Sequence, residues 1–476
     1  MPLGDNVKLL YVALLLAVCL APTREKSVTE NSVETSIRHV TVIDVGNGSE
    51  LKDQTVTIRG NRIASIAATQ DSHNSLSNSI DARGAFLIPG LWDMHVHVHD
   101  VDELPLYIAN GVTGIRIMSG EKDTAAYRAE LARQQPSPEI YLASAIVDGS
   151  PPVWPGSIVV RKPDDARRSV DEIKADGADF IRVYTRVPRE AYFALADQAK
   201  QQHIDFEGHV PDAITAQEAS NAGQRTMEHL QGIGVACSSQ QQALMNALSR
   251  AEYFRDRLAV TADAYRSIDQ AKCQALFAQF RGNNTWQVPT LSVLRIWGLL
   301  NESKLTSDSR LVYIGKKSRE RWQERIQPQL RIWTNQQYRF ARSIFSADQH
   351  ILGAMFRAGV PIMAGTDAMN PFCFPGFSLH DELAMMVDSG MTPLAALQSA
   401  TINRAKFPAG GESKLDAKES RVIEPGKIAN LVLLRADPLA DIHNTTKIEA
   451  VWLRGKYFDQ AALAQLLETA KQAAKH

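Results

Sequence analysis

Four histidines and one aspartate in this sequence have the types and the spacing of ligands for a divalent metal ion. His95 and His97 are two residues apart in the apolar segment LWDMHVHV, so on a β-strand their side chains point to the same side. His209, His229 and Asp367 each stand at or just after the end of another strand-like segment. Imidazole and carboxylate groups are common ligands of divalent transition metals such as Zn²⁺. A single histidine of this kind would more often be a packed or surface residue, but the five together predict a metal site.

The segments that carry these residues belong to a series of eight short apolar strands separated by helical patterns. The expected strands cover residues 91–98, 113–118, 140–147, 179–184, 204–210, 225–230, 285–291 and 361–367. This alternation predicts an α/β fold of parallel strands that close as a TIM-like (β/α)₈ barrel, with the carboxyl ends of the strands at one mouth. The long, polar, helix-prone stretches at about 238–284 and 297–348 are expected to be insertions above that mouth.

Both ends of the chain are rich in β-branched residues and differ from the middle. Strand-like segments occur at 40–45, 54–60 and 62–67, and similar ones return at 428–438 and 448–458, before a helical tail. We therefore expect a composite β-sandwich made from residues 33–88 and 415–476, with the barrel at 89–414.

The composition and the N-terminus give expectations about partners and location. The 476 residues include 52 Lys and Arg against 53 Asp and Glu, and without a basic excess no nucleic-acid partner is expected. The apolar run from Leu9 to Ala21 is shorter than the ~20 residues that a membrane-spanning helix needs, so no stable membrane span is expected. It has the layout of a signal peptide over residues 1–21, which predicts an exported, periplasmic or secreted protein; an uncleaved N-terminal helix is the alternative. Cys19 follows Val18 where a lipoprotein signal would have a small residue, so a lipid anchor is not expected.

The five candidates stand in motifs that resemble those of the metal-dependent amidohydrolase superfamily. LIPGLWDMHVH, FEGHVP, MEHL, MAGTDA and KIANLVLL occur in the order of that family, and the likeness covers residues 40–458. The chain is most similar to the imidazolonepropionase-like and prolidase-like branch. The resemblance implies a distorted (β/α)₈ barrel with a β-sandwich built from both chain ends.

The resemblance also implies a role for each candidate. His95 and His97 match the first-strand metal pair of the family. His209 and His229 match the ligands on the fifth and sixth strands. Asp367 matches the eighth-strand aspartate, which binds metal and shuttles a proton.

Arg182 departs from the pattern of the family. Two-metal members carry a carboxylated lysine at this place in the fourth strand, here DFIRVY, and a guanidinium, which stays protonated, cannot form that carbamate. We therefore favour one ion per chain, held by the first-strand pair, His209 and Asp367, while His229 orients the substrate. Two ions bridged by hydroxide and another anion are the alternative, and Arg182 could also face the barrel wall or a carboxylate.

This arrangement predicts a hydrolase of carbon–nitrogen bonds in amides, peptides or lactams. A bound Zn²⁺ lowers the pKa of its water from ~15.7 to about 7, so that a metal-bound hydroxide can attack the carbonyl carbon. Asp367 would take the proton and pass it to the leaving nitrogen, and His229 would polarise the carbonyl. Small-molecule amides, dipeptides and N-acyl amino acids are the expected substrates. The alternatives are a prolidase-like dipeptidase or carboxypeptidase with two metals, a lyase or isomerase, and a non-catalytic barrel with a structural metal.

Two further residues are candidate substrate contacts. Tyr184 shares a strand face with Arg182, near the mouth of the barrel. Arg295 follows the strand-like segment TWQVPTL and could pair with a substrate carboxylate. Tyr184 could equally be a packed residue and Arg295 a solvated one.

The cysteines give an expectation that depends on export. In an oxidising compartment Cys237 and Cys273 are expected to form a disulfide that ties the first insertion to the barrel rim. Cys373 lies in a Pro- and Phe-rich loop, so a buried free thiol is expected there. Three unpaired cysteines in a cytoplasmic enzyme are the alternative.

If residues 1–21 are a signal peptide, the mature protein should begin directly after Ala21, because signal peptidases cut after small residues. N-terminal sequencing of the protein recovered from the cell envelope or the medium measures this. An intact Met1 or an unprocessed leader in that material would contradict the prediction of export.

Overall fold

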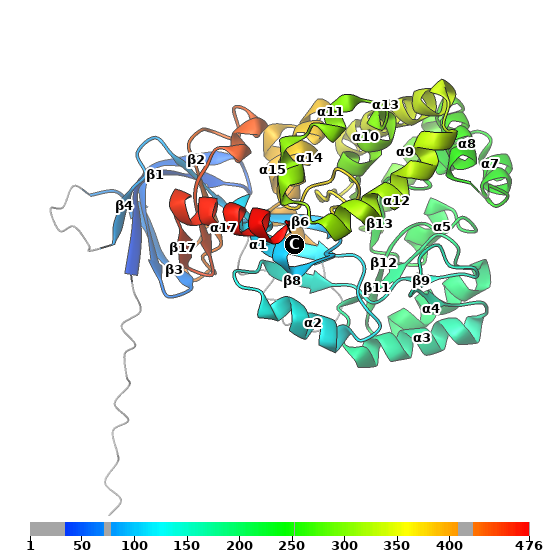
Figure 1. Ribbon diagram of the computed structural model, residues 1–476, viewed down its shortest axis with the longest axis horizontal. Coiled ribbons are helices and arrows are strands. Elements are labelled where there is room, and N and C mark those ends of the chain that lie inside the picture. Colours follow the sequence, from blue (N-terminus) through cyan, green and yellow to red (C-terminus); the bar gives the residue numbers. More distant parts are fainter. Residues whose placement is uncertain (1–33, 71–77, 252, 408–421, 476) are drawn as a thin grey trace, which may run out of the picture. The chain divides into compact units, whose positions relative to one another are not determined.

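Strands and helices alternate through the middle of the chain, and neighbouring strands there run parallel (Figure 1). One sheet has the order β6-β7-β8 and a second has the order β10-β9-β11-β12-β13-β14. Their bounds are β6 (Leu91–Val96), β7 (Val112–Ile117), β8 (Glu139–Leu142), β9 (Val147–Asp148), β10 (Ile158–Val159), β11 (Phe180–Val183), β12 (Asp205–Gly208), β13 (Thr226–Glu228) and β14 (Trp286–Val288). The prediction of a mixed α/β fold with parallel strands is confirmed.

The computed structural model describes residues 34–70, 78–251, 253–407 and 422–475. The predicted signal peptide and the predicted boundary at residues 414 and 415 lie outside these ranges. Among the described residues, no helix combines the length and the apolar character needed to cross a bilayer.

Isolated parallel bridges connect the two parallel sheets to each other and to the segment expected as the eighth strand. Ala143, just after β8, pairs with Phe180 of β11. Residues Ile362 and Ala368 pair with Gln287 of β14 and Val96 of β6. In the described chain, residues 361–367 are thus an extended segment held near its two ends rather than a continuous strand. Its regular path stops at Asp367, whose backbone φ of 60° is left-handed.

Helices connect the parallel strands, because a parallel pair needs a crossover. They are α1 (Leu104–Ala109), α2 (Thr124–Arg133), α3 (Pro163–Asp176), α4 (Arg189–Gln201) and α5 (Ala216–Asn221). Three more helices, α14 (Phe377–Asp388), α15 (Pro393–Ser399) and α16 (Ile402–Lys406), follow residues 361–367 and lead toward the terminal sheet. Helix α3 shows why the sequence forms them: Pro163 occupies the first turn, and Gly177 ends the helix with a left-handed φ of 81°. Its buried residues recur at helical spacing and face α4, which lies alongside it (Figure 1).

The two predicted insertions are helical in their described residues. The first contains α6 (Ile233–Cys237), α7 (Gln241–Leu248), α8 (Phe254–Arg266) and α9 (Gln270–Gly282). The second begins near the end of α10 (Leu291–Leu299) and contains α11 (Ser303–Thr306), α12 (Lys316–Ile332) and the larger part of α13 (Asn335–Arg357). Helix α13 packs against both α10 and α8, so the two insertions support each other.

Strands from both chain ends share one eight-stranded sheet with the order β17-β16-β15-β5-β1-β2-β3, and β4 also pairs with β1. Their bounds are β1 (Glu34–Asp44), β2 (Ser49–Arg59), β3 (Arg62–Ala68), β4 (Ser79–Asp81), β5 (Phe86–Pro89), β15 (Leu431–Leu434), β16 (Ile448–Leu453) and β17 (Lys456–Phe458). Strands from residues 34–89 and 431–458 thus form one sheet with its own apolar core, and the expected sandwich stays a prediction. Register shifts on either side of Val40, where bulges bend a strand, let β1 pair with β4 at one end and β5 at the other. Helix α17 (Gln460–Ala473) packs against α1.

A disulfide joins Cys237, at the end of α6, to Cys273 in α9. The two residues are 36 positions apart, and their Cα atoms are separated by 4.7 Å. Cys373 is a buried free thiol. The disulfide therefore ties the far end of the first insertion to the segment that directly follows β13.

Replacing both bridged cysteines by alanine should lower the free energy of unfolding by about 3–4 kcal/mol, because the open chain regains the entropy of a loop of this length. Urea denaturation of the wild type and of the double variant Cys237→Ala/Cys273→Ala measures the difference. A reducing agent should destabilise the wild type and leave the double variant unchanged. Equal midpoints for the two oxidised proteins would contradict the prediction.

Candidate metal centre

The structure brings the five ligand-type residues together at the carboxyl ends of the parallel strands. Nε2 of His97 lies 3.0 Å from Oδ1 of Asp367, and Nε2 of His95 lies 3.3 Å from the same oxygen. His95, His229 and Asp367 each offer one ligand atom, and these atoms lie within 4.8 Å of one another. The ring of His209 is 4.9 Å from that of His229, centroid to centroid. His229 therefore belongs to the same close group as His95. With one ion per chain, His229 was expected to orient the substrate rather than to bind the metal.

Two of these residues have a backbone conformation that side chains rarely adopt. His229 and Asp367 both have a φ of 60°, and Thr290, which follows β14, has a φ of 49°. Left-handed conformations of residues other than glycine are strained and persist only where the surroundings enforce them. At these strand ends the strained backbone turns His229 and Asp367 toward the common centre.

Three of the histidines use Nδ1 for a hydrogen bond and leave Nε2 for the centre. The partners of His209 and His229 follow neighbouring strands, whereas the partner of His95 lies on β13, in the other parallel sheet. The pairs are His95 with Glu228 at 2.6 Å, His209 with Thr185 at 2.9 Å, and His229 with Thr290 at 2.7 Å. A hydrogen bond at one ring nitrogen fixes the ring and directs the other nitrogen, as is common for metal-binding histidines.

The atoms that face the centre fit a bound cation. Nε2 of His95, Nε2 of His209 and Oδ1 of Asp367 are buried, and none of them makes a hydrogen bond of good geometry among the described residues, although Oδ1 of Asp367 lies close to two histidine nitrogens. Buried polar atoms without a partner are rare in proteins because each loses its hydration. A divalent ion would satisfy nitrogen and carboxylate atoms of this kind together, so the donor set fits the metal that the sequence predicts.

A buried ion-pair network lies behind His95. Arg116 on β7 forms two hydrogen bonds to the carboxylate of Glu228, of 2.9 and 3.1 Å, and also pairs with Glu207. Burial alone would raise the pKa of Glu228, but Arg116 and His95 hold it at about 2. Glu228 is therefore ionised and accepts a hydrogen bond from the Nδ1–H group of His95, which leaves a lone pair on Nε2. Burial raises the pKa of Glu207 to about 7, although Arg116 opposes this shift.

The charge states of the other candidates suit metal binding as well. Burial lowers the pKa of His229 to about 3, although Asp367 acts in the opposite direction. Burial, with help from the charge of Arg182, also lowers the pKa of His209 well below its ordinary value. Burial would raise the pKa of Asp367, but His95 and His229 hold it well below its ordinary value. Neutral imidazoles and an ionised carboxylate are the forms that bind a divalent ion.

Two buried carboxylates fix the backbone around the centre. Asp93 accepts hydrogen bonds from the backbone N–H of His95 at 3.2 Å and from the hydroxyl of Thr366 at 2.6 Å, which joins β6 to the segment before Asp367. Glu382 accepts from the backbone N–H groups of Leu291 and Ser292 at 2.8 and 2.7 Å. Glu382 thereby holds the start of α10, directly after the Thr290 that positions His229.

A cavity of about 480 Å³ opens onto the centre. Its lining includes four of the five ligand-type residues, together with His99, Arg182, Tyr184, Trp154 and, from α12, Arg321, Trp322, Glu324 and Arg325. The indole N–H of Trp322 donates a 2.9 Å hydrogen bond to the carbonyl of Met369, and Arg325 hydrogen-bonds Asn370. Helix α12 is therefore fastened to the loop that follows Asp367 and forms part of the cavity wall.

Arg182 lies inside the protein and lines this cavity. Its side chain is 1 % exposed, and its Nε and Nη1 atoms have no partner in the described structure. A Cβ atom at Gly208 would collide with the carbonyl of Val183 and lie 3.2 Å from Cδ of Arg182, so glycine leaves room for the arginine stem. The guanidinium therefore belongs to the cavity wall near the centre rather than to the solvent-exposed surface.

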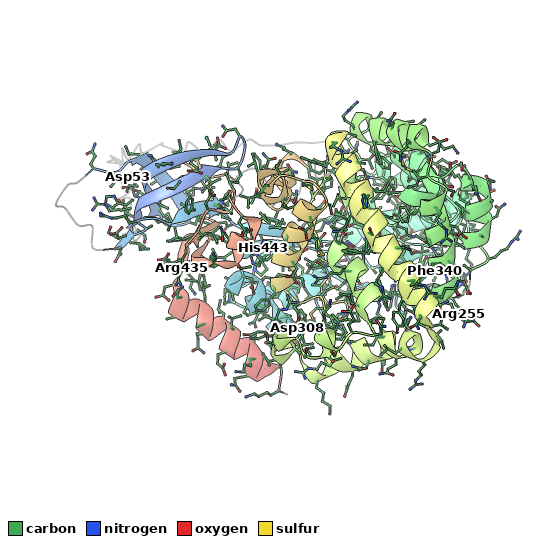
Figure 2. All side chains as sticks on the ribbon, turned by 90° about the horizontal axis from the view of Figure 1, so that it is seen from above. Asp53, Arg255, Asp308, Phe340, Arg435 and His443 are labelled. Atoms are coloured by element: carbon green, nitrogen blue, oxygen red, sulfur yellow. A yellow bond between two sulfur atoms is a disulfide. The ribbon has the colours of Figure 1, made fainter. Side chains whose placement is uncertain are left out.

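The two candidate substrate contacts lie in different places. Tyr184 lines the cavity, stacks on His209 with 4.0 Å between ring centroids, and accepts a 2.8 Å hydrogen bond from Trp154. Arg295 is outside the cavity lining and lies 3.6 Å from Asp381. It belongs to an ion-pair cluster that includes Arg310 and the Asp308 labelled in Figure 2.

Several residues that hold the centre were not predicted from the sequence. They are Arg116, Glu228, Thr185, Thr290 and Arg325. An arginine inside the apolar segment TGIRIM and a glutamate inside RTMEHL are unusual in buried strands, and that was the available signal for Arg116 and Glu228. Thr185, Thr290 and Arg325 carry no comparable signal, because their roles come from neighbours distant in the sequence.

Comparisons with known proteins show a similar fold. Residues 305–457 match the Amidohydrolase family. Similar solved structures include a bottromycin amidohydrolase, with a TM-score of 0.73, 23% identity and coverage of 93% of this chain and 90% of the other. A Xaa-Pro dipeptidase with bound methionine has a TM-score of 0.63 and 20% identity, with coverage of 90% and 100%. A prolidase complexed with N-methylphosphonate-L-proline has a TM-score of 0.61 and 18% identity, with coverage of 90% and 100%. No curated protein matches the sequence.

The substitution Glu228→Gln should weaken metal binding about 10- to 100-fold, because His95 loses the charged partner that directs Nε2 to the centre. Titration of the metal-free protein with Zn²⁺, followed calorimetrically, measures the affinity. Glu207→Gln is the matched control, since Glu207 is also buried and pairs with Arg116 but has no contact with His95. Equal affinities for the two variants would contradict the role given to Glu228.

Proposed function

We propose that the chain is a metal-dependent hydrolase of carbon–nitrogen bonds of the amidohydrolase superfamily, whose family model matches residues 305–457. The observation that carries the proposal is the set of buried, unpartnered ligand atoms on His95, His209 and Asp367. His97 and His229 complete the donor set within the same cluster. Sites that hold a metal only for structure have no need of a cavity, whereas this centre opens into one of about 480 Å³.

We also propose that the parallel strands form one distorted (β/α)₈ barrel. The bridges Ala143–Phe180, Gln287–Ile362 and Ala368–Val96 support this, because they connect the ends of the two parallel sheets in sequence around a ring. Such a ring would place every strand end that carries a candidate ligand at one mouth. If the strand pairing of a strongly distorted barrel is interrupted, the barrel consists of short sheets joined by an extended segment, as found here.

The residues of the chain have distinct tasks in the proposed reaction. A divalent ion held by the histidines and Asp367 would supply a Lewis acid and lower the pKa of water at the centre. The ionised Asp367 carboxylate would take a proton from the attacking water and deliver it to the leaving nitrogen. His229, kept neutral and fixed by Thr290, would orient the substrate carbonyl. Helix α12 would limit the access of bulk water to the cavity.

We propose one ion per chain, with Zn²⁺ as the favoured metal. Arg182 supports a single ion, because its buried positive charge stands where a bridging anion would be needed for two. Two positive ions beside a guanidinium would repel each other without that anion. Arg182 would instead receive an oxygen of the substrate through its unpartnered N–H groups.

The substrates would be small amides, dipeptides or N-acyl amino acids. The names of the similar structures, an amidohydrolase, a dipeptidase and a prolidase, favour this class over lactams. A prolidase-like dipeptidase with two ions is the second candidate, favoured by the closeness of His229 to His95 and Asp367, since a fourth histidine at the centre would serve a second ion.

We further propose that the protein is exported. The disulfide between Cys237 and Cys273 supports an oxidising compartment, because such bridges are rare in proteins of the cytosol.

Asp367→Asn should lower the turnover number of the zinc-loaded enzyme by about 10² or more, since the amide keeps the shape of the side chain and cannot carry the proton. A panel of dipeptides and N-acyl amino acids, assayed for amine release with wild type and variant, measures this. Asp381→Asn, in the ion-pair cluster outside the cavity, is the control and should retain activity. Wild-type turnover after complete removal of metal, or a few-fold effect of Asp367→Asn, would contradict the proposal.

A further inference from the structure

Exposed apolar side chains gather at three segments of the described chain. Val153 and Trp154 lie in the loop between β9 and β10, and Tyr253 and Phe254 stand at the start of α8. Leu330 and Ile332 lie at the end of α12. Large apolar side chains that gather on a surface mark places where a ligand or partner binds, because their exposure to water is unfavourable. These three segments are far apart in sequence, so their contacts decide whether they make one surface.

Ring contacts join these segments into one strip, formed by Trp154, Trp297, Phe254 and Trp333 and called here the aromatic strip. The ring of Phe254 lies 4.9 Å from that of Trp297 and 5.8 Å from that of Trp333. The guanidinium carbon of Arg325 lies 5.1 Å from the ring centroid of Trp154 and 5.7 Å from that of Trp297. Arg325 therefore bridges the two tryptophans and makes the strip continuous.

The strip begins inside the candidate active site. Trp154 and Arg325 both line the cavity that contains His209, His229 and Asp367. Trp154 also donates its indole N–H to Tyr184, which stacks on His209. From there the strip leads outward to Phe254, which is 37 % exposed, and the next residue, Arg255, lies at the outer edge of the insertion helices (Figure 2). If the scissile bond of a substrate lies at the centre, the groups next to that bond would contact these rings.

The dimensions of the strip favour an extended chain over a single small group. Phe254, Trp297 and Trp333 form a cluster whose rings are 4.9 to 6.3 Å apart, and Arg325 links this cluster to Trp154 at the cavity. One residue of extended peptide spans about 3.3–3.6 Å, so the strip from Trp154 to the cluster is longer than one side chain can cover. Aromatic faces accept apolar side chains at low entropic cost, because they are rigid. The insertions that carry the strip are fixed by the disulfide of α9 and by the packing of α13 on α8 and α10.

We propose that the aromatic strip binds the apolar side chains of a peptide substrate, so that the enzyme prefers oligopeptides with aromatic or branched aliphatic residues near the bond that is cut. The position of the scissile bond in this inference rests on the proposed function. Binding of apolar side chains to the strip requires only the aromatic rings. Phe254 and Trp297 would be specificity-determining residues that do not touch the reacting atoms.

Two pentapeptides of equal length and charge test the strip: Ala-Phe-Leu-Phe-Ala and Ala-Ser-Ala-Ser-Ala. Binding is measured by calorimetry on the zinc-loaded Asp367→Asn protein, so that turnover does not interfere. The apolar peptide should bind about 10-fold or more tightly, the scale expected for burying one or two large side chains. Adding Phe254→Ala should remove most of that preference, and Phe254→Tyr, which keeps the ring, should restore it. Tyr457→Ala changes a comparably exposed aromatic residue on β17 and should leave the preference intact.

Equal binding of the two peptides, or a preference that survives Phe254→Ala, would overturn the inference. Hydrolysis of both peptides by the wild type is scored separately. Preferential binding without hydrolysis would support the strip and count against the proposed function. Hydrolysis of both peptides at equal rates with equal binding would support the function and overturn the strip.

Discussion

The ion pair between Glu228 and Arg116 is the interaction on which the centre depends. Four imidazoles, two carboxylates and two guanidinium groups lie in or beside one buried space, and each buried charge is unfavourable unless it has a partner. Glu228 connects these groups, because it neutralises Arg116 on one side and holds the ring of His95 on the other. With Glu228 ionised, His95 presents a lone pair rather than a proton to Asp367 and the centre. The pair also ties β7 to β13, so the same contact sets both the fold and the chemistry.

The rest of the centre repeats this principle with neutral groups. Thr185 and Thr290 fix His209 and His229 without adding charge, and Asp93 and Glu382 hold the backbone next to the ligands. The strained backbone of His229 and Asp367 is enforced by these contacts. Arg182 is the exception, because it is buried and keeps two unpartnered nitrogen atoms that face the cavity. An unpaired buried cation beside a proposed metal centre is best explained by an anionic oxygen that arrives with the substrate.

The convergence of the histidines and Asp367 was predictable from the sequence, because a strand period of two and the common mouth of parallel strands determine where such residues meet. The alternation of strands and helices was predictable for the same reason. The partners of the histidines were not, since Thr185 and Thr290 acquire their roles only when distant strands come together. Arg295 illustrates the same limit: its place after a strand indicated the cavity, but Asp381 on α14 draws it into an ion-pair cluster. The aromatic strip likewise combines residues from segments that are distant in the sequence.

The central claim is that His95, His97, His209 and Asp367 hold one divalent ion, with His229 beside it, and that Arg182 takes the place of an anion bridging two ions. Anomalous X-ray diffraction at the zinc edge, on crystals of the zinc-loaded protein, tests it most directly. The account predicts a single strong anomalous peak within bonding distance of Nε2 of His95 and the carboxylate of Asp367, with the Arg182 guanidinium beside it. Two peaks of equal height in the cavity would contradict the role of Arg182, and a peak elsewhere with none at His95 would contradict the metal centre itself.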